Sequence, residues 1–391
     1  MEGKMKLFKV LISAIALLAT LILPAQANNP NCTEVDGDYI VSFPRGISIA
    51  NEMRTVPGRP VQAKFTYSSV LNGFAATLTA EQACAFKRRP GVTVELDGVV
   101  EILGKPSASS TTGWYSWGLD RIDETTLPLD KANFERTSNG TGVTAYVIDT
   151  GIYAAHQQFG GRVQPGFTAI TDGRGTEDCN GHGTHVAGTI GGADSGVANA
   201  VKLVPVRVLN CRGSGLNSGV ISGVDWVYAN VNSPAVVNMS LGGGISTALD
   251  SSVANLINEK GITVVVAAGN SNVDASTSSP ARVPEAITVG ATNSRDTKAS
   301  FSNFGSIVDV YAPGVGIKSA WIGGLTASKN LDGTSMASPH VAGIVARYLG
   351  ASGNGTKSPV VIQADVKSLA TVVPTLDKPI ACLTGLNECR P

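Results

Sequence analysis

From about Trp117 onward, short uninterrupted apolar runs alternate with stretches of helical character. The runs, most of which end at Gly, Asn or Asp, are Val143–Ile148, Val201–Leu209, Val236–Met239, Ile262–Ala268 and Ile287–Val289. Helix-like stretches such as His185–Gly192 and Ser218–Tyr228 lie between several of them. Strands without polar alternation are buried on both faces, which is typical of a parallel sheet covered by helices on each side. We therefore predict a three-layer α/β/α domain, with functional residues beyond the carboxyl ends of the strands.

A smaller α+β unit precedes this pattern. Its candidate strands are Tyr39–Phe43, a pair within Phe65–Leu78 that turns at Asn72-Gly73, and Val92–Ile102. A capping signal at Thr79–Gln82 predicts a short helix between them. The polar stretch Lys105–Thr112 that follows has the composition of an exposed linker and of a favoured cleavage site. We divide the chain into segments 1–27, 28–110 and 111–391.

The first segment has the layout of a secretory signal peptide. Three lysines precede an apolar run from Val10 to Leu23, and Pro24–Ala27 provides small residues for cleavage after Ala27. The alternative is a membrane anchor, but the run is shorter than the ~20 residues that a span needs, and no second such run follows. We therefore predict a secreted, extracellular protein with no stable membrane anchor.

The composition allows a large core and excludes some partners. Hydrophobic residues make up 43% of the chain, and the 45 glycines favour tight turns and close backbone approach. Lys and Arg together number 30, as do Asp and Glu, so the basic surplus typical of proteins that bind nucleic acid or acidic membranes is missing. We expect a monomer that binds no nucleic acid.

The even number of cysteines predicts disulfides in an oxidising compartment. The six are Cys32, Cys84, Cys179, Cys211, Cys382 and Cys389. Without C-x-x-C pairs a zinc ribbon is disfavoured, but six cysteines allow about 15 connectivities. If the chain is cut between its two folded units, each piece must pair within itself, which leaves Cys32–Cys84 in the first. The local pair Cys382–Cys389 then leaves Cys179–Cys211 in the second.

Three local patterns contain the residues of a nucleophilic mechanism. Asp149 ends the apolar run of Val147-Ile148-Asp149-Thr150-Gly151, His182 opens a helical stretch within Asn180–Thr189, and Ser335 opens another within Asp332–Gly343. A serine hydroxyl needs an adjacent base, and imidazole takes and returns a proton near neutral pH. A carboxylate fixes the tautomer of that imidazole. The helix opening at Ser335 provides N–H groups for a developing oxyanion.

These patterns, in the order Asp, His, Ser, resemble the subtilisin superfamily, and most closely its proteinase K and aqualysin branch. The similarity runs from about Trp117 to the helix after Ser335 and includes Asn238–Gly244 and Ala267–Asn270. It implies a subtilisin-like serine endopeptidase that hydrolyses polypeptides through an acyl-enzyme. Segment 28–110 resembles the inhibitor-like propeptide of that family, which implies an autoprocessed zymogen whose propeptide acts as intramolecular inhibitor.

The resemblance also implies roles for individual residues. Asn270 would donate a hydrogen bond to the oxyanion, although Gly-Asn is also a common way to end a strand. Backbone pairing with a substrate strand is implied for Gly213, Ser214, Gly215, Ser240, Leu241 and Gly242. A roomy pocket is implied by the small residues Ala267, Ala268 and Gly269. Because no acidic cluster lines that pocket, we expect broad specificity rather than strict preference for basic residues.

Two structural calcium sites are implied in the same way. The first would use the carboxylate of Asp309 and the carbonyl oxygens of Pro284 and Ala286. The second would use the acids Asp120, Asp123 and Asp130. Oxygen ligands suit this hard cation. The alternatives are a solvated Asp309 and neutralisation of the second cluster by Arg121.

Other polar residues are given structural or surface roles. His185 is expected to be a buried structural partner, and His340, five residues after Ser335, to lie more than a turn below it. His156, Asp172 and Asp178 are expected to lie in solvated loops. The resemblance matches Cys179 and Cys211 to a disulfide of the aqualysin branch, whose second disulfide is missing here. Two alternatives remain: a non-catalytic binding protein on this fold, which the intact triad disfavours, and an α/β-hydrolase esterase, which requires G-x-S-x-G and the order Ser, Asp, His.

Overall fold

The structure, a computed structural model, describes residues 32–108, 113–131 and 138–382. The predicted signal peptide lies outside these ranges. Within them, none of the helices is long and apolar enough to cross a membrane.

The N-terminal unit is a four-stranded antiparallel sheet with two helices. The strands are β1 (Gly37–Ser42), β2 (Phe65–Tyr67), β3 (Gly73–Leu78) and β4 (Thr93–Leu96), in the order β2-β3-β1-β4. The helices are α1 (Ile49–Glu52) and α2 (Ala80–Lys87). Thr79 and Gln82 form a reciprocal capping box at the start of α2, as the sequence predicts. Cys84 of α2 is bonded to Cys32, which ties the chain before β1 to this helix.

The large domain is built on a seven-stranded sheet in which every neighbouring pair is parallel. In spatial order its strands are β15 (Val310–Pro313), β14 (Ile287–Thr292), β13 (Thr263–Ala267), β11 (Ala235–Met239), β7 (Thr144–Asp149), β9 (Lys202–Arg207) and β8 (Phe167–Thr168). All residues of β11, β13, β14 and β15 are buried. The predicted mainly parallel sheet is therefore confirmed.

Helices cover both faces of this sheet. Alternate residues of a strand point to opposite faces, so Val147 of β7 packs with α4 (His182–Gly191) and α7 (Thr334–Gly350). Ile148 packs on the other face with α5 (Asn217–Asn230) and α6 (Thr247–Lys260). The α8 helix (Pro359–Ser368) lies on the α7 face, where Ile362 and Val366 join the core. These are the three predicted layers.

Two small sheets join the chain between the units to the large domain. Strand β5 (Val99–Ile102) lies between β10 (Ser214–Leu216) and β12 (Leu241–Gly243), antiparallel to both. Strand β6 (Lys105–Pro106) pairs with β17 (Ser328–Asp332), which pairs with β16 (Ile317–Ala320). The remaining elements are α3 (Trp117–Ile122) and the 3₁₀ turns Gln157–Phe159 and Ala275–Thr277.

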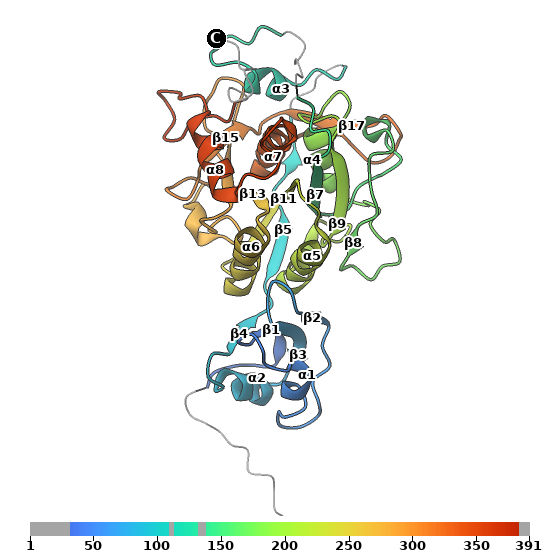
Figure 1. The fold of residues 1–391 in the computed structure, drawn as a ribbon, viewed down its shortest axis with the longest axis vertical. Coiled ribbons are helices and arrows are strands. Elements are labelled where there is room, and N and C mark those ends of the chain that lie inside the picture. The colour runs from blue at the N-terminus through green and yellow to red at the C-terminus, as the bar shows by residue number, and fades with distance from the viewer. Residues whose placement is uncertain (1–31, 109–112, 132–137, 383–391) are drawn as a thin grey trace, which may run out of the picture.

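The connecting segment differs from its prediction. We predicted one strand over Val92–Ile102, but the structure divides it at Asp97-Gly98 into β4 and β5, which belong to different sheets. Figure 1 shows β5, in cyan, leaving the blue N-terminal unit and running between α5 and α6 into the large domain.

Candidate active site

The sheet and two helix openings bring the three predicted catalytic residues into one region. Asp149 is the last residue of β7, His182 the first of α4 and Ser335 the second of α7, and all three are buried. His182 Nδ1 lies 2.8 Å and 3.0 Å from the two carboxylate oxygens of Asp149. Because the carboxylate can only accept, Nδ1 holds the proton of a neutral ring and Nε2 holds the lone pair.

The hydroxyl of Ser335 is turned away from that lone pair. Ser335 Oγ donates to the carbonyl oxygen of Ser240 at 2.8 Å. Among the described residues, His182 Nε2 has no hydrogen-bond partner. The pair of Asp149 and His182 is therefore formed, and a contact between His182 and Ser335 needs a rotation of the Ser335 side chain.

A peptide carbonyl of the chain itself lies beside Ser335. The oxygen of Leu103 accepts hydrogen bonds from Asn270 Nδ2 at 2.6 Å and from the Ser335 backbone N–H at 3.3 Å. Asn270 is held in place because its own side-chain oxygen accepts from Thr334 N at 2.9 Å and from Thr334 Oγ1 at 2.8 Å. Two fixed donors directed at one carbonyl oxygen are the arrangement that stabilises a tetrahedral oxyanion.

Strand β5, which leads to Leu103, occupies the predicted substrate groove. Its register pairs Glu101 with Ser214 and with Gly242, on opposite sides. Gly213 and Ser240 extend the pairing, since their carbonyl oxygens accept from Ile102 N at 3.0 Å and Leu103 N at 3.4 Å. The other predicted pairing residues, Gly215 and Leu241, lie opposite Val100 and Ile102. All six are thereby brought together around one extended segment.

A cavity of about 210 Å³ adjoins this strand. Leu103, Gly242 and Asn270 line it together with the predicted small residues Ala267, Ala268 and Gly269. A Cβ added to Gly242 would lie 3.2 Å from Leu103 Cδ1, so the small residue leaves room for the side chain at position 103.

Comparison with known proteins agrees with this geometry. Residues 140–377 match the model of the subtilase family, peptidase family S8. The chain belongs to the subtilase family. It is 52% identical to an extracellular serine proteinase of Thermus sp. (strain Rt41A), over 78% of this chain and 73% of that protein.

Further relatives come from bacteria and fungi. Alkaline serine exoprotease A of Vibrio alginolyticus is 50% identical over 80% of this subtilase, which spans only 57% of that protein. A cuticle-degrading protease of Metarhizium anisopliae is 39% identical over 95% of this chain and 94% of its own. A crystal structure of a cold-adapted subtilisin-like serine proteinase superposes with a TM-score of 0.65 at 54% identity, over 68% of this chain and 97% of that one. Family and relatives together make this chain a serine endopeptidase.

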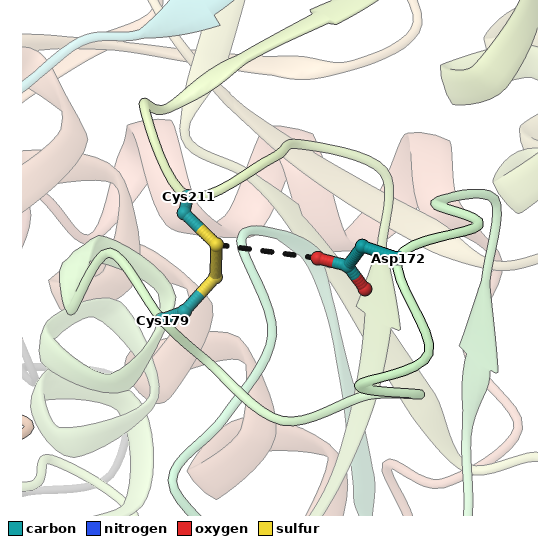
Figure 2. Close-up of side chains that lie close together, drawn as sticks. All are labelled: Asp172, Cys179 and Cys211. Carbon is teal, nitrogen blue, oxygen red and sulfur yellow. Dashed lines mark hydrogen bonds between the residues drawn. A yellow bond between two sulfur atoms is a disulfide. The ribbon is translucent and has the colours of Figure 1, made fainter.

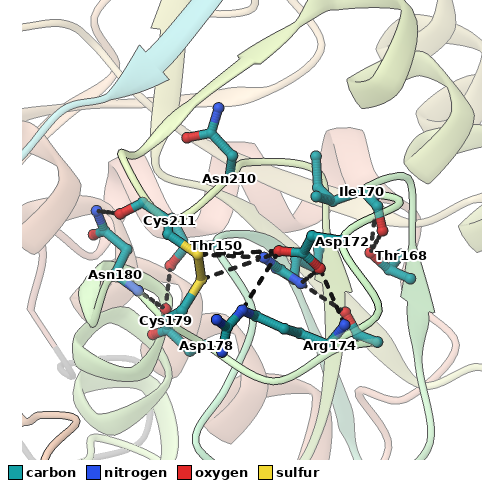
Figure 3. Close-up of polar contacts among 12 residues, drawn as sticks. Thr150, Thr168, Ile170, Asp172, Arg174, Asp178, Cys179, Asn180, Asn210 and Cys211 are labelled. Atoms are coloured by element: carbon teal, nitrogen blue, oxygen red, sulfur yellow. Dashed lines mark hydrogen bonds and ion pairs between the residues drawn. A yellow bond between two sulfur atoms is a disulfide. The ribbon is translucent and has the colours of Figure 1, made fainter.

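The loop before His182 is fixed by a carboxylate that we expected to be solvated. Asp178 is buried, and one of its oxygens accepts from Thr150 Oγ1 and from the N–H groups of Asn180 and Gly181, each at 2.9 Å. Its other oxygen accepts from Thr184 N at 2.9 Å and Oγ1 at 2.6 Å. Figure 3 shows Asp178 directed at Thr150 and Asn180. In this subtilase Asp178 thus joins the neighbour of Asp149 to the helix that begins at His182, and an acid before a helix opening was the signal for it.

A disulfide and a buried arginine stabilise the outer part of this loop. Cys179 is bonded to Cys211, two residues before Gly213 (Figure 2). Asp172 lies beside the sulfurs, but a disulfide offers no thiolate, so this trio is no metal site. Arg207, fully buried, pairs with Asp172 at 2.6 Å and holds the pKa of that carboxyl at about 2. Asp172 is exposed, as predicted, and is also paired with Arg207 within the polar contacts of Figure 3.

The remaining cysteines divide between described and undescribed residues. Cys32–Cys84 is formed, as stated above. The predicted pair of Cys382 and Cys389 stays a prediction, because Cys389 lies outside the described residues.

The other histidines of this subtilase bond to backbone carbonyls, whereas His182 bonds to a carboxylate. His185 Nε2 lies 3.0 Å from Ile317 O, and His340 Nδ1 lies 2.7 Å from Met336 O. Burial lowers the pKa of His185 to about 3 and that of His340 to about 4, so both rings are neutral at pH 7. His156 is also buried, against our expectation of a surface loop, with Nε2 at 2.8 Å from Ala327 O.

The structure arranges the residues of the two predicted cation sites differently. Oxygens of Asp120, Glu124 and Asp130 lie within 4.8 Å of one another and could hold a metal ion. Glu124, which the sequence analysis missed, takes the position expected for Asp123 in that cluster. Burial, followed by the charge of Asp120, raises the pKa of Glu124, as expected for crowded carboxyl groups.

The oxygens of Asp309, Pro284 and Ala286 also come together, but around a nitrogen of the chain. Gln363 Nε2 donates to Ala286 O at 3.0 Å, Pro284 O at 3.1 Å and Asp309 Oδ2 at 3.3 Å. Lys367 Nζ lies 2.9 Å from Asp309 Oδ1. As arranged, this set does not fit calcium, which needs the space that the Gln363 amide fills.

Proposed function

We propose that this subtilase is a secreted zymogen that cuts its own chain between Leu103 and Gly104. The supporting observation is the position of the Leu103 carbonyl, whose oxygen is bonded by Asn270 Nδ2 and Ser335 N while β5 fills the groove. The sequence analysis put the cut within the linker at 105–112. The geometry instead favours the bond that directly follows the bonded carbonyl.

The chemistry follows from the atoms around that bond. After rotation, Ser335 Oγ attacks the Leu103 carbonyl carbon, and His182 Nε2 takes the hydroxyl proton. Asp149 stabilises the imidazolium that forms, and Asn270 with the Ser335 N–H stabilises the oxyanion. The C–N bond then breaks, His182 returns its proton to the Gly104 amine, and water hydrolyses the acyl-enzyme. A Cβ at Gly104 would lie 2.9 Å from His182 Nε2, so this ring is near enough to protonate that amine.

The same groove accounts for polypeptide substrates. An extended segment that adds between β10 and β12 gains affinity from backbone hydrogen bonds, largely independent of its side chains. The residues that the large domain contributes to the pocket beside it are uncharged and mostly small, so we propose broad endopeptidase specificity. Before cleavage, β5 in the groove makes the N-terminal unit an intramolecular inhibitor, and after cleavage it would stay there as a bound, separate inhibitor.

A structural calcium ion would suit the cluster of Asp120, Glu124 and Asp130. Three carboxylates supply the oxygen ligands that a hard cation prefers, and the cation would relieve their mutual repulsion. No step of the proposed peptide hydrolysis uses it.

Intact-mass analysis of the purified precursor tests the proposed cut. The wild-type protein should yield a fragment that begins at Gly104, together with turnover of a peptide anilide. The Ser335→Ala variant, purified alone, should give neither. A new terminus within residues 105–112 would reject the Leu103–Gly104 bond, and maturation of pure Ser335→Ala protein would reject self-cleavage.

A further inference from the structure

The side chains of α8 complete the oxygen cluster at Asp309. One nitrogen, Gln363 Nε2, is within hydrogen-bond distance of a carboxylate oxygen and two carbonyl oxygens, those of Pro284 and Ala286. An amide NH₂ has only two hydrogens, so the three oxygens share them. Three oxygens directed at one point form the kind of site that otherwise receives a cation.

The negative charge of Asp309 in that cluster is balanced by a lysine of the same helix. Lys367 Nζ lies 2.9 Å from Asp309 Oδ1, and the Asp309 side chain is only 9% exposed. The second carboxylate oxygen also accepts from Thr288 N at 2.9 Å. Asp309 is therefore neutralised from within the chain, and a divalent cation placed there would face the ammonium group.

The geometry of α8 allows both contacts at once. Gln363 and Lys367 are four residues apart and so lie on one face of the helix. Ile362 and Val366 are buried in the core and anchor the helix beside Asp309. The contacts join α8 to the residues before β14 and to Asp309, directly before β15.

We infer that Gln363 and Lys367 replace a bound cation at Asp309, so that this junction of α8, β14 and β15 is stable without calcium. Calcium can enter only if the Gln363 amide leaves the centre of the three oxygens and the Lys367–Asp309 pair separates. The two candidate sites then differ: the Asp120, Glu124 and Asp130 cluster accepts calcium, whereas the Asp309 site excludes it.

Calcium counting in the full chain tests this inference. All variants are made on Ser335→Ala, which prevents self-digestion and separates the result from the proposed activity. Bound calcium is counted by titration calorimetry after chelator treatment, and Tm is measured in chelator and in millimolar calcium. Asp309→Asn should leave the calcium count unchanged and lower Tm equally in both conditions.

The double variant Gln363→Ala, Lys367→Met should open the site. We expect one additional bound calcium ion and a Tm that is lower in chelator but recovers by about 2–4 °C in calcium, the scale for one contact in a domain of this size. Lys357→Met is the matched control, because that lysine pairs with Asp365 away from the cluster and should not change the count.

Two results would overturn the inference. One is the loss of a bound calcium ion on Asp309→Asn. The other is a double variant that folds and binds no additional calcium. If the double variant does not fold, the single variant Lys367→Met is tested instead. A Tm in chelator equal to that of the Ser335→Ala parent would show that the ammonium group does not replace a cation.

Discussion

The two sides of the Leu103–Gly104 bond are held very differently. On the acyl side, β5 is the middle strand of three, and its partners β10 and β12 both belong to the large domain. On the leaving-group side, within the part of the chain that the structure describes, β6 pairs with β17 alone, through Lys105 and Pro106. One further backbone bond follows, from Ser107 N to Asn330 O at 3.0 Å. Cleavage would therefore free the weakly paired new terminus and leave the acyl side in the groove.

Carboxylates of the N-terminal unit strengthen the acyl side further. Asp97 accepts from the N–H of Ser218, in the first turn of α5, at 2.9 Å. Glu95 accepts from Ser246 Oγ and from the N–H of Ala248, in the first turn of α6. Helix openings have unpaired N–H groups and a positive dipole end, so these acids satisfy both. The large domain thus depends on the N-terminal unit to complete two of its helix openings.

The largest effect is expected where the two sides meet. Ser335→Ala removes the nucleophile and should lower kcat by about 10⁶, with the precursor left uncut. Gel analysis and peptide turnover measure both effects. The matched control is Ser338→Ala on the same helix, which should retain cleavage at Leu103. If Ser338→Ala instead abolishes cleavage in a folded protein and Ser335→Ala does not, the nucleophile is wrongly assigned.

The second largest loss of activity is expected from Asp149→Asn. An amide in place of the carboxylate favours the wrong imidazole tautomer, so kcat should fall by about 10⁴ while both sides of the bond stay in place. Asp172→Asn, which alters another acid in an ion pair, is the control. A loss of less than tenfold in a stopped peptide-anilide assay would mean that Asp149 does not orient His182.

Asn270→Ala removes a donor that acts on the acyl side alone. We expect kcat to fall by roughly 10²–10³ with KM little changed, because the donor acts mainly on the transition state. Steady-state kinetics of the mature enzyme separate the two parameters. A rise in KM at constant kcat would show that Asn270 binds the ground state instead.

Local patterns predicted much of this molecule, because they depend on neighbouring residues. Apolar runs that end at Asp149 or before Gly269 correctly indicated buried parallel strands. The positions of the predicted catalytic residues followed from the same rule, since strand ends and helix openings meet at one edge of such a sheet.

What the sequence could not predict depends on partners distant in the chain. Strand β5 separates from β4 because its partners lie more than a hundred residues later, at Ser214 and Leu241. Likewise, no local signal connects Gln363 with Asp309, because their contact depends on how α8 packs. His156 is polar and follows a turn, yet the carbonyl of Ala327 satisfies it in the interior.

A substitution at Gly104 tests the leaving-group side. A Cβ there would lie 2.9 Å from Nε2 and Cδ2 of His182, so Gly104→Val should displace the ring and slow self-cleavage by about 10- to 100-fold. Ser107→Val, at the residue that directly follows β6, is the control. Maturation is followed by quantitative gel analysis. An unchanged rate would show that the leaving-group side is loose enough to move away from His182.

The smallest effect is expected at the far end of the acyl side, from Asp97→Asn. Asparagine keeps an oxygen that can accept from Ser218 N but removes the negative charge at the opening of α5, which is worth about 0.3–1 kcal/mol. The separate N-terminal segment should therefore inhibit the mature enzyme up to about fivefold less well. Burial raises the pKa of the Asp97 carboxyl above its ordinary value. At pH values between the ordinary and the raised pKa, a larger fraction of Asp97 is therefore protonated in the complex than in the separated fragments. Inhibition should tighten as the pH falls through that window and weaken as it rises. Inhibition constants over a pH series from 7.5 down to about 4, close to the ordinary value, measure this. Asp36→Asn is the control, because the partner of Asp36 among the described residues, Ala80 N, lies within the N-terminal unit. If Asp97→Asn keeps the pH dependence of the wild type, another group carries it and the acyl side is not held through Asp97.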